Sequence, residues 1–196
     1  MLRSCEGEEI KFGTHVVTKQ AFYRSEHSYA IVNLKPLAPG HVLVCPLTPY
    51  ERLGDPAPVE LADLWSTVTM VQKILGRIYF KPEDGRGSFT VAVQDGPEAG
   101  QTVPHLHVHV IPRVAGDMGE NEAANDEIYT KLASEEGNIG GALWDLERRP
   151  QPGGGMPRVE DASRVAREPE DMHAEAEKYR EHFMKLYGSW CDSRLV

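Results

Sequence analysis

The chain of 196 residues has few cysteines and no long apolar run. Its three cysteines, Cys5, Cys45 and Cys191, are an odd number in no metal-ligand spacing, so neither a disulfide framework nor a zinc knuckle is indicated. Residues 1–11 carry three glutamates and no apolar run, and no stretch approaches the length that spans a bilayer. We therefore expect no secretory signal and no membrane partner, and a reducing location in the cytoplasm or also in the nucleus.

Positive charge is also scarce. Lysine and arginine total 21 against 30 aspartates and glutamates, which gives a formal net charge of -9. Nucleic-acid coats and membrane-surface proteins need a basic face, so both classes are disfavoured and no nucleic-acid partner is expected. A phosphate ligand would have to be held locally, by backbone amides, histidines or a metal ion.

The hydrophobic pattern predicts a single α+β domain, because the chain is long enough for one core and too short for two. Short runs rich in β-branched residues predict strands at 29–33, 41–46, 88–94 and 105–112. Between them, apolar residues recur at three- and four-residue steps and predict one helix of about twenty residues. Its stripe comprises Leu61, Leu64, Trp65, Val68, Val71, Leu75 and Ile78. The expected fold is an antiparallel sheet of about five strands with one long packed helix.

The remaining segments flank this domain, which we place at residues 12–149, after an N-terminal tail at 1–11. Residues 150–170 contain four prolines, three consecutive glycines and no aromatic residue, leucine or isoleucine, so a disordered linker is predicted. A C-terminal helix is predicted at 171–188, followed by a tail at 189–196. Its apolar stripe is Met172, Ala176, Tyr179, Phe183 and Leu186, and Gly188 is placed to end it. We expect this helix to dock back on the core; a partner-binding or dimer-contact helix is the alternative.

Three histidines alternate with apolar residues in the segment 105–110, which reads HLHVHV. Successive side chains of a strand point to opposite faces, so His105, His107 and His109 are expected to share one face. The residues between them, Leu106, Val108 and Val110, then face the core. Three imidazoles in line are expensive to desolvate and pack poorly, so this arrangement indicates a functional site.

Two chemistries fit three aligned histidines. As zinc ligands, the outer two side chains would stand about 13 Å apart on a strand, whereas a zinc–nitrogen bond is about 2.0 Å long; an adjacent pair could share an ion only with a ligand from a distant segment. As a covalent catalyst, the middle imidazole would attack phosphorus, since an ordinary histidine is largely neutral near pH 7. The preceding loop favours the second chemistry: Gly96 and Gly100 allow close backbone approach, and Gln101 and Thr102 offer donors to phosphate oxygens.

Residues 94–113, QDGPEAGQTVPHLHVHVIPR, resemble the signature of the Fhit branch of the histidine-triad (HIT) superfamily, and residues 30–46, AIVNLKPLAPGHVLVCP, extend the resemblance. The chain can be followed against the family from Phe12 to about Tyr129, and the region after Trp144 resembles longer fungal members. The resemblance implies a HIT-like fold and hydrolysis of dinucleoside polyphosphates, chiefly diadenosine triphosphate to AMP and ADP, through an AMP-histidine intermediate. It also implies a homodimer with a continuous sheet, and a divalent cation, magnesium or manganese, carried by the substrate without a tightly bound metal.

Residue roles follow from the same resemblance. His107 matches the nucleophile, His109 the contact to the α-phosphate and scissile oxygen, and His105 and His41 the histidines that brace the site. A hydrogen-bond chain through His105 and His41 is expected to fix the tautomer of His107. The matched substrate contacts are His15, Asn33, Gln94, Gly100, Gln101, Thr102 and Val103. One departure is Pro104, where animal members often carry lysine.

Other activities remain as alternatives. The phosphoramidase branch of the superfamily, which removes amines from AMP, typically has serine where Thr102 stands and lacks the Ile111-Pro112-Arg113 ending. The uridylyltransferase branch has glutamine in place of the third histidine, whereas His109 is present here. A nucleotide-binding signalling module with slow turnover would need the same intact site as an enzyme.

Overall fold

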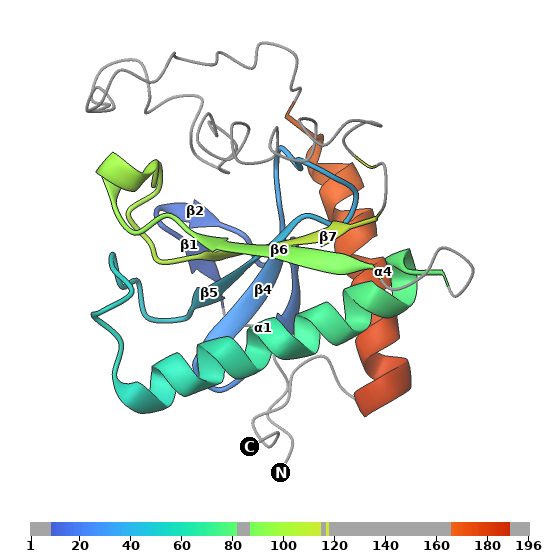
Figure 1. Cartoon of the computed structure of the whole chain (residues 1–196), viewed down its shortest axis with the longest axis horizontal. Coiled ribbons are helices and arrows are strands. Elements are labelled where there is room, and N and C mark those ends of the chain that lie inside the picture. Colours follow the sequence, from blue (N-terminus) through green and yellow to red (C-terminus); the bar gives the residue numbers. More distant parts are fainter. Residues whose placement is uncertain (1–8, 82–86, 115–116, 118–165, 189–196) are drawn as a thin grey trace.

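The computed structural model describes residues 9–81, 87–114, 117 and 166–188. Within these ranges the chain forms one five-stranded antiparallel sheet in the order β3-β4-β5-β7-β6 (Figure 1). Its strands are β3 (Ala21–Arg24), β4 (Ser28–Val32), β5 (Val42–Pro46), β6 (Ser88–Val93) and β7 (Val108–Arg113). A hairpin with two residues in each strand, β1 (Lys11–Phe12) and β2 (His15–Val16), precedes the sheet. The predicted α+β class is confirmed.

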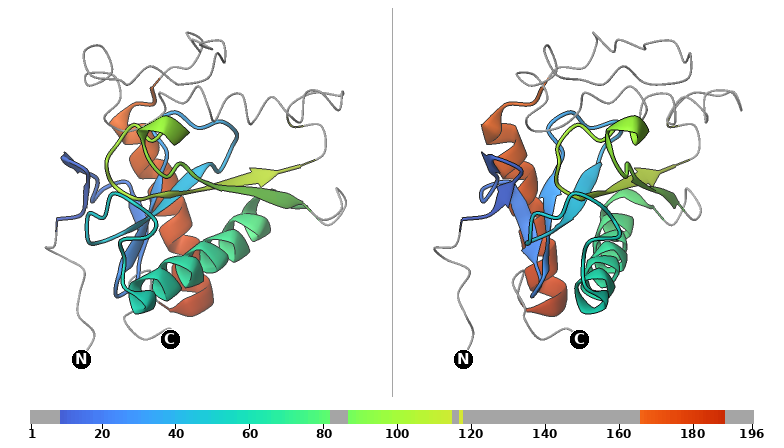
Figure 2. Two further views of the ribbon diagram at one scale, coloured as in Figure 1. Left: turned by 60° about the vertical axis from the view of Figure 1, so that its left-hand side comes forward. Right: turned by 90° about the vertical axis from the view of Figure 1, so that its left-hand side faces the viewer.

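Helix α1 (Pro58–Tyr79) lies along one face of the sheet (Figures 1 and 2). A proline occupies its first position, and the Glu60 carboxylate accepts a hydrogen bond from the backbone N–H of Ala57 at 2.9 Å. Its buried residues are Leu64, Thr67, Val68, Val71, Ile74 and Leu75. The predicted stripe was wrong at Trp65, which is 39% exposed, because the buried face extends to Thr67 and Ile74, and Trp65 lies roughly opposite these two around the helix.

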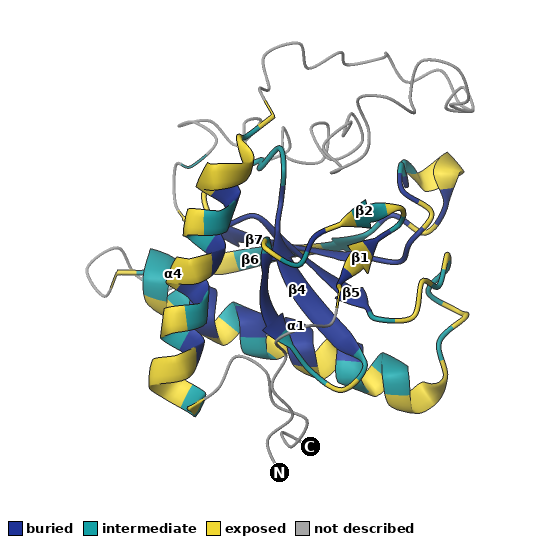
Figure 3. Ribbon diagram, turned by 180° about the vertical axis from the view of Figure 1, so that it is seen from behind, coloured by how far each residue is buried: buried dark blue, intermediate teal, exposed yellow. Residues whose placement is uncertain are grey.

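Both faces of the central strands are covered, and β4 and β5 are buried along their whole length (Figure 3). Leu106, Val108 and Val110 pack in the cluster that includes the α1 residues, as the alternation predicted. The opposite face carries a second cluster with Tyr29, Ile31, Leu43 and Cys45, joined by Phe12 of the hairpin. Strand β7 starts at Val108, so the predicted strand at 105–112 began three residues too early.

The C-terminal helix α4 (Pro169–Tyr187) docks on the edge strand β3. Phe183 stacks on Tyr23 with 4.6 Å between ring centroids, and Met172, Ala176 and Tyr179 are also buried in the α1-side cluster. Leu186 is 42% exposed, so the predicted stripe ends one turn earlier. The helix begins two residues before the predicted start and ends at Gly188, whose φ of +76° is a conformation that glycine adopts easily.

Several predicted segments lie outside the described residues: the tail at 1–8, the acidic part of the domain beyond residue 117, the linker from 150 to 165 and the tail at 189–196. Neither helix in the described ranges has the length and apolar character needed to cross a membrane.

Candidate active site

Four buried histidines gather on the sheet face opposite α1. The ladder between β5 and β7 pairs Leu43 with His109, and His41 directly precedes β5. The ring centroids of His107 and His109 are 4.9 Å apart, and those of His41 and His109 are 5.2 Å apart. His41, His105, His107 and His109 are each at most 1% exposed. The structure therefore brings together the four histidines that the sequence singled out.

His41 and His109 form a directional relay. The backbone N–H of Leu37 donates to Nδ1 of His41 at 3.1 Å, so this nitrogen carries a lone pair. In a neutral ring the proton then sits on Nε2 of His41, which lies 3.0 Å from Nδ1 of His109 and donates to it. The proton of a neutral His109 must then be on Nε2. The relay thus makes His109 a hydrogen-bond donor through Nε2.

His107 is held in the opposite tautomer. Its Nδ1 lies 2.8 Å from the backbone carbonyl oxygen of His105, and a carbonyl oxygen can only accept. The Nδ1–H therefore donates, and the lone pair of the neutral ring is on Nε2. His107 can act as a nucleophile through Nε2.

The ring of His105 is held between the hairpin and the end of β5. Its Nδ1 accepts a hydrogen bond from the backbone N–H of Gly13 at 3.1 Å, and its Nε2–H donates to the carbonyl of Pro46 at 2.8 Å. The expected chain is corrected in part: His105 fixes the tautomer of His107 through its backbone carbonyl, and the ring of His41 contacts His109. The His105 ring instead joins the hairpin to the end of β5.

Burial keeps two of these rings uncharged. It lowers the pKa of His109 to about 4, because the charged imidazolium would lose its hydration. Burial also lowers the pKa of His105, against a smaller upward effect of its hydrogen bond to Pro46. Both rings are therefore neutral at pH 7, as the relay requires for His109.

The loop before the histidines packs against the β5–α1 connection. Gly96 and Gly100 have φ of +115° and +93°, and a Cβ on Gly96 would lie 1.4 Å from Nη1 of Arg52. The side-chain amide of Gln101 donates to the backbone carbonyl of Glu51 at 2.9 Å. Val103 belongs to the second core cluster. The loop is thus held against the β5–α1 connection, and one of the two amide N–H groups of Gln101 is used within the protein.

A family model of the HIT domain matches residues 14–116. The chain belongs to the HIT domain family. It is 37% identical, over 90% of its length and 95% of the relative's, to the Schizosaccharomyces pombe protein named bis(5'-nucleosyl)-tetraphosphatase (asymmetrical). It is 39% identical, over 88% of its length and 83% of the relative's, to the Arabidopsis thaliana protein named bifunctional bis(5'-adenosyl)-triphosphatase/adenylylsulfatase FHIT. The crystal structure of the C. elegans NitFhit protein matches 91% of this chain and 31% of its own, with a TM-score of 0.61 and 31% identity.

The HIT domain match includes all the predicted site residues. In the structure, these residues differ from one another in burial and in the contacts that they make. Asn33 and Gln94 are buried, and Asn33 contacts His41. Thr102 is half-buried, and so is His15, on the hairpin that Gly13 connects to His105. Among the residues that the structure describes, no group of three histidine, cysteine or acidic side chains is placed to hold a metal ion.

Two contributors escaped the sequence reasoning, and both lie outside the matched HIT domain. The ring of Phe12 packs at 5.3 Å from the rings of both His105 and His107. Arg167, just before α4, contacts the backbone of Asn33. Phe12 was visible only as the start of the resemblance, and Arg167 fell in the predicted linker.

Proposed function

We propose that this HIT domain hydrolyses dinucleoside polyphosphates, chiefly diadenosine triphosphate to AMP and ADP, through an AMP adduct on His107. One observation carries the proposal: the hydrogen bond from Nδ1 of His107 to the carbonyl of His105 leaves the ring's lone pair on Nε2. A lone pair on a positioned, neutral imidazole is what attack on phosphorus requires. The names of the S. pombe and A. thaliana relatives support the same class of substrate.

The first step forms a bond between Nε2 of His107 and the α-phosphorus and breaks the bond to the bridging oxygen, whose electron pair leaves with ADP. His109 presents Nε2–H on the same sheet face and donates a hydrogen bond to the α-phosphate or the scissile oxygen. In the second step water attacks phosphorus and releases a proton to solvent, and the N–P bond breaks to give AMP and neutral His107. Since His107 is 1% exposed, substrate binding must first uncover it.

The proposed substrate contacts are His15, Asn33, Gln94, Gly100, Gln101, Thr102 and Val103. The positive φ of Gly100 supports a backbone contact to phosphate there. Gln101 uses one N–H of its side-chain amide on the carbonyl of Glu51, which leaves the second N–H for a phosphate oxygen. Val103 is 6% exposed and would act through its backbone.

Trapping the adduct tests this function. Rapid quenching during turnover should recover an acid-labile AMP adduct on the peptide that contains His107, and His107→Asn should abolish it. The variant should keep substrate binding and lose kcat by several powers of ten. Retention of configuration at phosphorus would agree with two displacements. Inversion, or near-normal kcat in His107→Asn, would contradict the covalent pathway.

The substrate range needs a separate experiment, because the two relatives are named for different polyphosphate lengths. Rates for diadenosine triphosphate, diadenosine tetraphosphate and an AMP amidate should be measured side by side. We expect diadenosine triphosphate to be cleaved fastest. A preference for the amidate would instead support the phosphoramidase alternative.

Three further features belong to the proposal. The substrate brings magnesium or manganese on its polyphosphate, where the cation would neutralise charge on the leaving ADP. The protein is a homodimer through β6, which is an edge of the described sheet. It works in the cytoplasm, alone or together with the nucleus, and in both compartments the free buried thiol of Cys45 would stay reduced.

A further inference from the structure

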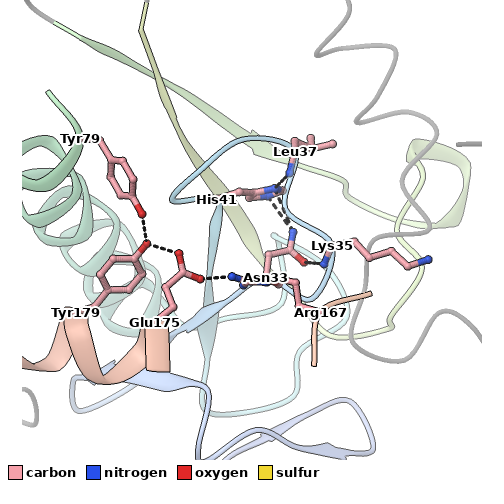
Figure 4. Close-up of polar contacts among 8 residues, drawn as sticks. All are labelled: Asn33, Lys35, Leu37, His41, Tyr79, Arg167, Glu175 and Tyr179. Atoms are coloured by element: carbon pink, nitrogen blue, oxygen red, sulfur yellow. Dashed lines mark hydrogen bonds and ion pairs between the residues drawn. The ribbon is translucent and has the colours of Figure 1, made fainter. Parts of the chain in front are cut away.

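Arg167 bridges the start of α4 and the end of β4 (Figure 4). Its guanidinium Nη2 donates to the backbone carbonyl of Asn33, and its Nη1 forms an ion pair with Glu175. The backbone N–H of Arg167 donates to the carbonyl of Leu34 at 3.1 Å. One residue thus holds the chain at Asn33 and Leu34 through both its side chain and its backbone.

The guanidinium of Arg167 is itself held in place through its partner Glu175. Glu175 accepts a second hydrogen bond from the hydroxyl of Tyr179 at 2.6 Å, and the hydroxyls of Tyr179 and Tyr79 are 2.7 Å apart. Tyr79 is the last residue of α1. Both helices of the described structure are therefore connected to Arg167 by one polar chain (Figure 4).

In front of Arg167, Asn33 contacts the imidazole relay. The backbone N–H of Lys35 lies 3.4 Å from Oδ1 of Asn33, which identifies the oxygen of the amide, so the NH2 group faces His41. Nδ2 of Asn33 is 3.2 Å from Nδ1 and 3.1 Å from Nε2 of His41. Because Nε2 of His41 carries a proton in the relay, the NH2 group of Asn33 can donate only to Nδ1, the nitrogen that also accepts from the Leu37 N–H.

We infer that Arg167 is a positioning residue for hydrolysis: it fixes Asn33, and thereby keeps His41 and His109 in the tautomers that turn Nε2–H of His109 toward the substrate. The inference rests on the proposed function. It gives the C-terminal helix, which lies outside the matched HIT domain, a part in the chemistry. Arg167 touches neither substrate nor reacting atoms in this arrangement.

The chain offers a matched control in Arg180, which is also an arginine of the α4 region. Its guanidinium pairs with Glu177 and donates to the backbone carbonyls of Thr18, Lys19 and Ala21, at the edge strand β3, which β4 separates from β5. Arg167→Met and Arg180→Met each remove a guanidinium that joins the α4 region to backbone carbonyls on the sheet side. Only the first leads to the histidines.

Steady-state kinetics on the full chain with diadenosine triphosphate should separate the two variants. Arg167→Met should lower kcat about tenfold or more, since small misplacements of catalytic groups are costly, and should change KM less than about threefold. Arg180→Met should have the kcat of the wild type even where it loses as much thermal stability as Arg167→Met. Arg167→Lys should recover part of the kcat that Arg167→Met loses. Equal kcat losses in the two methionine variants, or an unchanged kcat in Arg167→Met, would overturn the inference.

Imidazole 15N NMR supplies a readout that does not depend on turnover. The wild type should show the Nε2–H tautomer for His41 and His109, and Arg167→Met should show mixed tautomers while Arg180→Met should not. If the wild type hydrolyses none of the nucleotides, the proposed function fails, while an unperturbed relay in Arg167→Met refutes the positioning role. Should Arg167→Met not fold, Glu175→Gln replaces it: intermediate losses in kcat and tautomer order are expected, and wild-type values for both would refute the role.

Discussion

His107 directly precedes β7 and His109 lies in it, yet their Nε2 atoms carry different groups. A backbone carbonyl accepts from Nδ1 of His107, and a second histidine donates to Nδ1 of His109. The first ring is thereby left with a lone pair and the second with an N–H on Nε2. Their hydrogen-bond partners thus make His107 the nucleophile and His109 the hydrogen-bond donor to the charge that develops on the phosphate.

Burial of His109 makes the stability of the fold depend on pH. The folded pKa of about 4 lies below the usual value of about 6.5, because burial disfavours the charged ring. Stability from this group is full above about pH 6.5 and is lost as the pH falls toward 4, where only the unfolded chain binds the proton. We expect a decrease of about 3 kcal/mol in the free energy of unfolding between pH 7 and pH 4, measured by urea denaturation.

His109→Asn provides the comparison, since asparagine does not titrate. The variant should lose distinctly less stability over the same pH interval than the wild type, with His105 accounting for part of the remainder. Identical pH dependences in the two proteins would show that His109 is protonated equally easily in the folded and unfolded chains.

The residues of this site were predictable from the sequence, but their hydrogen-bond partners were not. Strand alternation placed His107 and His109 on one face and Val108 in the core, because the period of two is a local property. The partners that set the tautomers include the Leu37 N–H and the His105 carbonyl. Every residue carries a backbone carbonyl and every residue except proline an N–H, so only the positions of these groups in space distinguish them.

At the scale of elements, the turn between β4 and β5 is fixed against the end of α1. Gly40 has a φ of +80°, and a Cβ there would lie 2.5 Å from Cε2 of Tyr79. The next residue is His41, so the position of this turn decides the position of the relay. Glycine satisfies both the backbone conformation and the close approach of the tyrosine ring.

We therefore predict that Gly40→Ala destabilises the protein by about 1–3 kcal/mol, because alanine is strained at this φ and overlaps Tyr79. Gly54→Ala is the control, since a Cβ at Gly54 has nothing within 4 Å. Thermal unfolding of both variants checks the expectation. Equal melting temperatures for the two variants would mean that the turn can move away from Tyr79 without loss.

The two helices show what apolar periodicity predicts correctly and what it misses. Apolar spacing predicted α1 and α4 and most of their buried residues, because burial of one face imposes the helical period on the sequence. It misjudged Trp65 and Leu186, which are apolar but lie at the margins of the buried faces. It placed Arg167 in a linker, since a single arginine that contacts a distant carbonyl produces no period.

At the scale of the whole molecule, the two sheet edges differ. Strand β3 is covered by α4, whereas β6 pairs only with β7 among the strands that the structure describes. Strand β6 is six residues long, and its Val91 is 37% exposed. A long strand with an uncharged edge readily accepts another strand. This edge is where the proposed homodimer would continue the sheet.

Val91→Lys tests that dimer. A lysine on an edge strand opposes pairing with an identical strand, because the two charges would be brought together and partly desolvated. We expect the wild type to sediment as a dimer and Val91→Lys to shift to the monomer. Val16→Lys adds the same charge on the hairpin, where Val16 is 54% exposed, and should stay dimeric. A monomeric wild type, or a Val91→Lys protein as dimeric as Val16→Lys, would show that β6 does not form the interface.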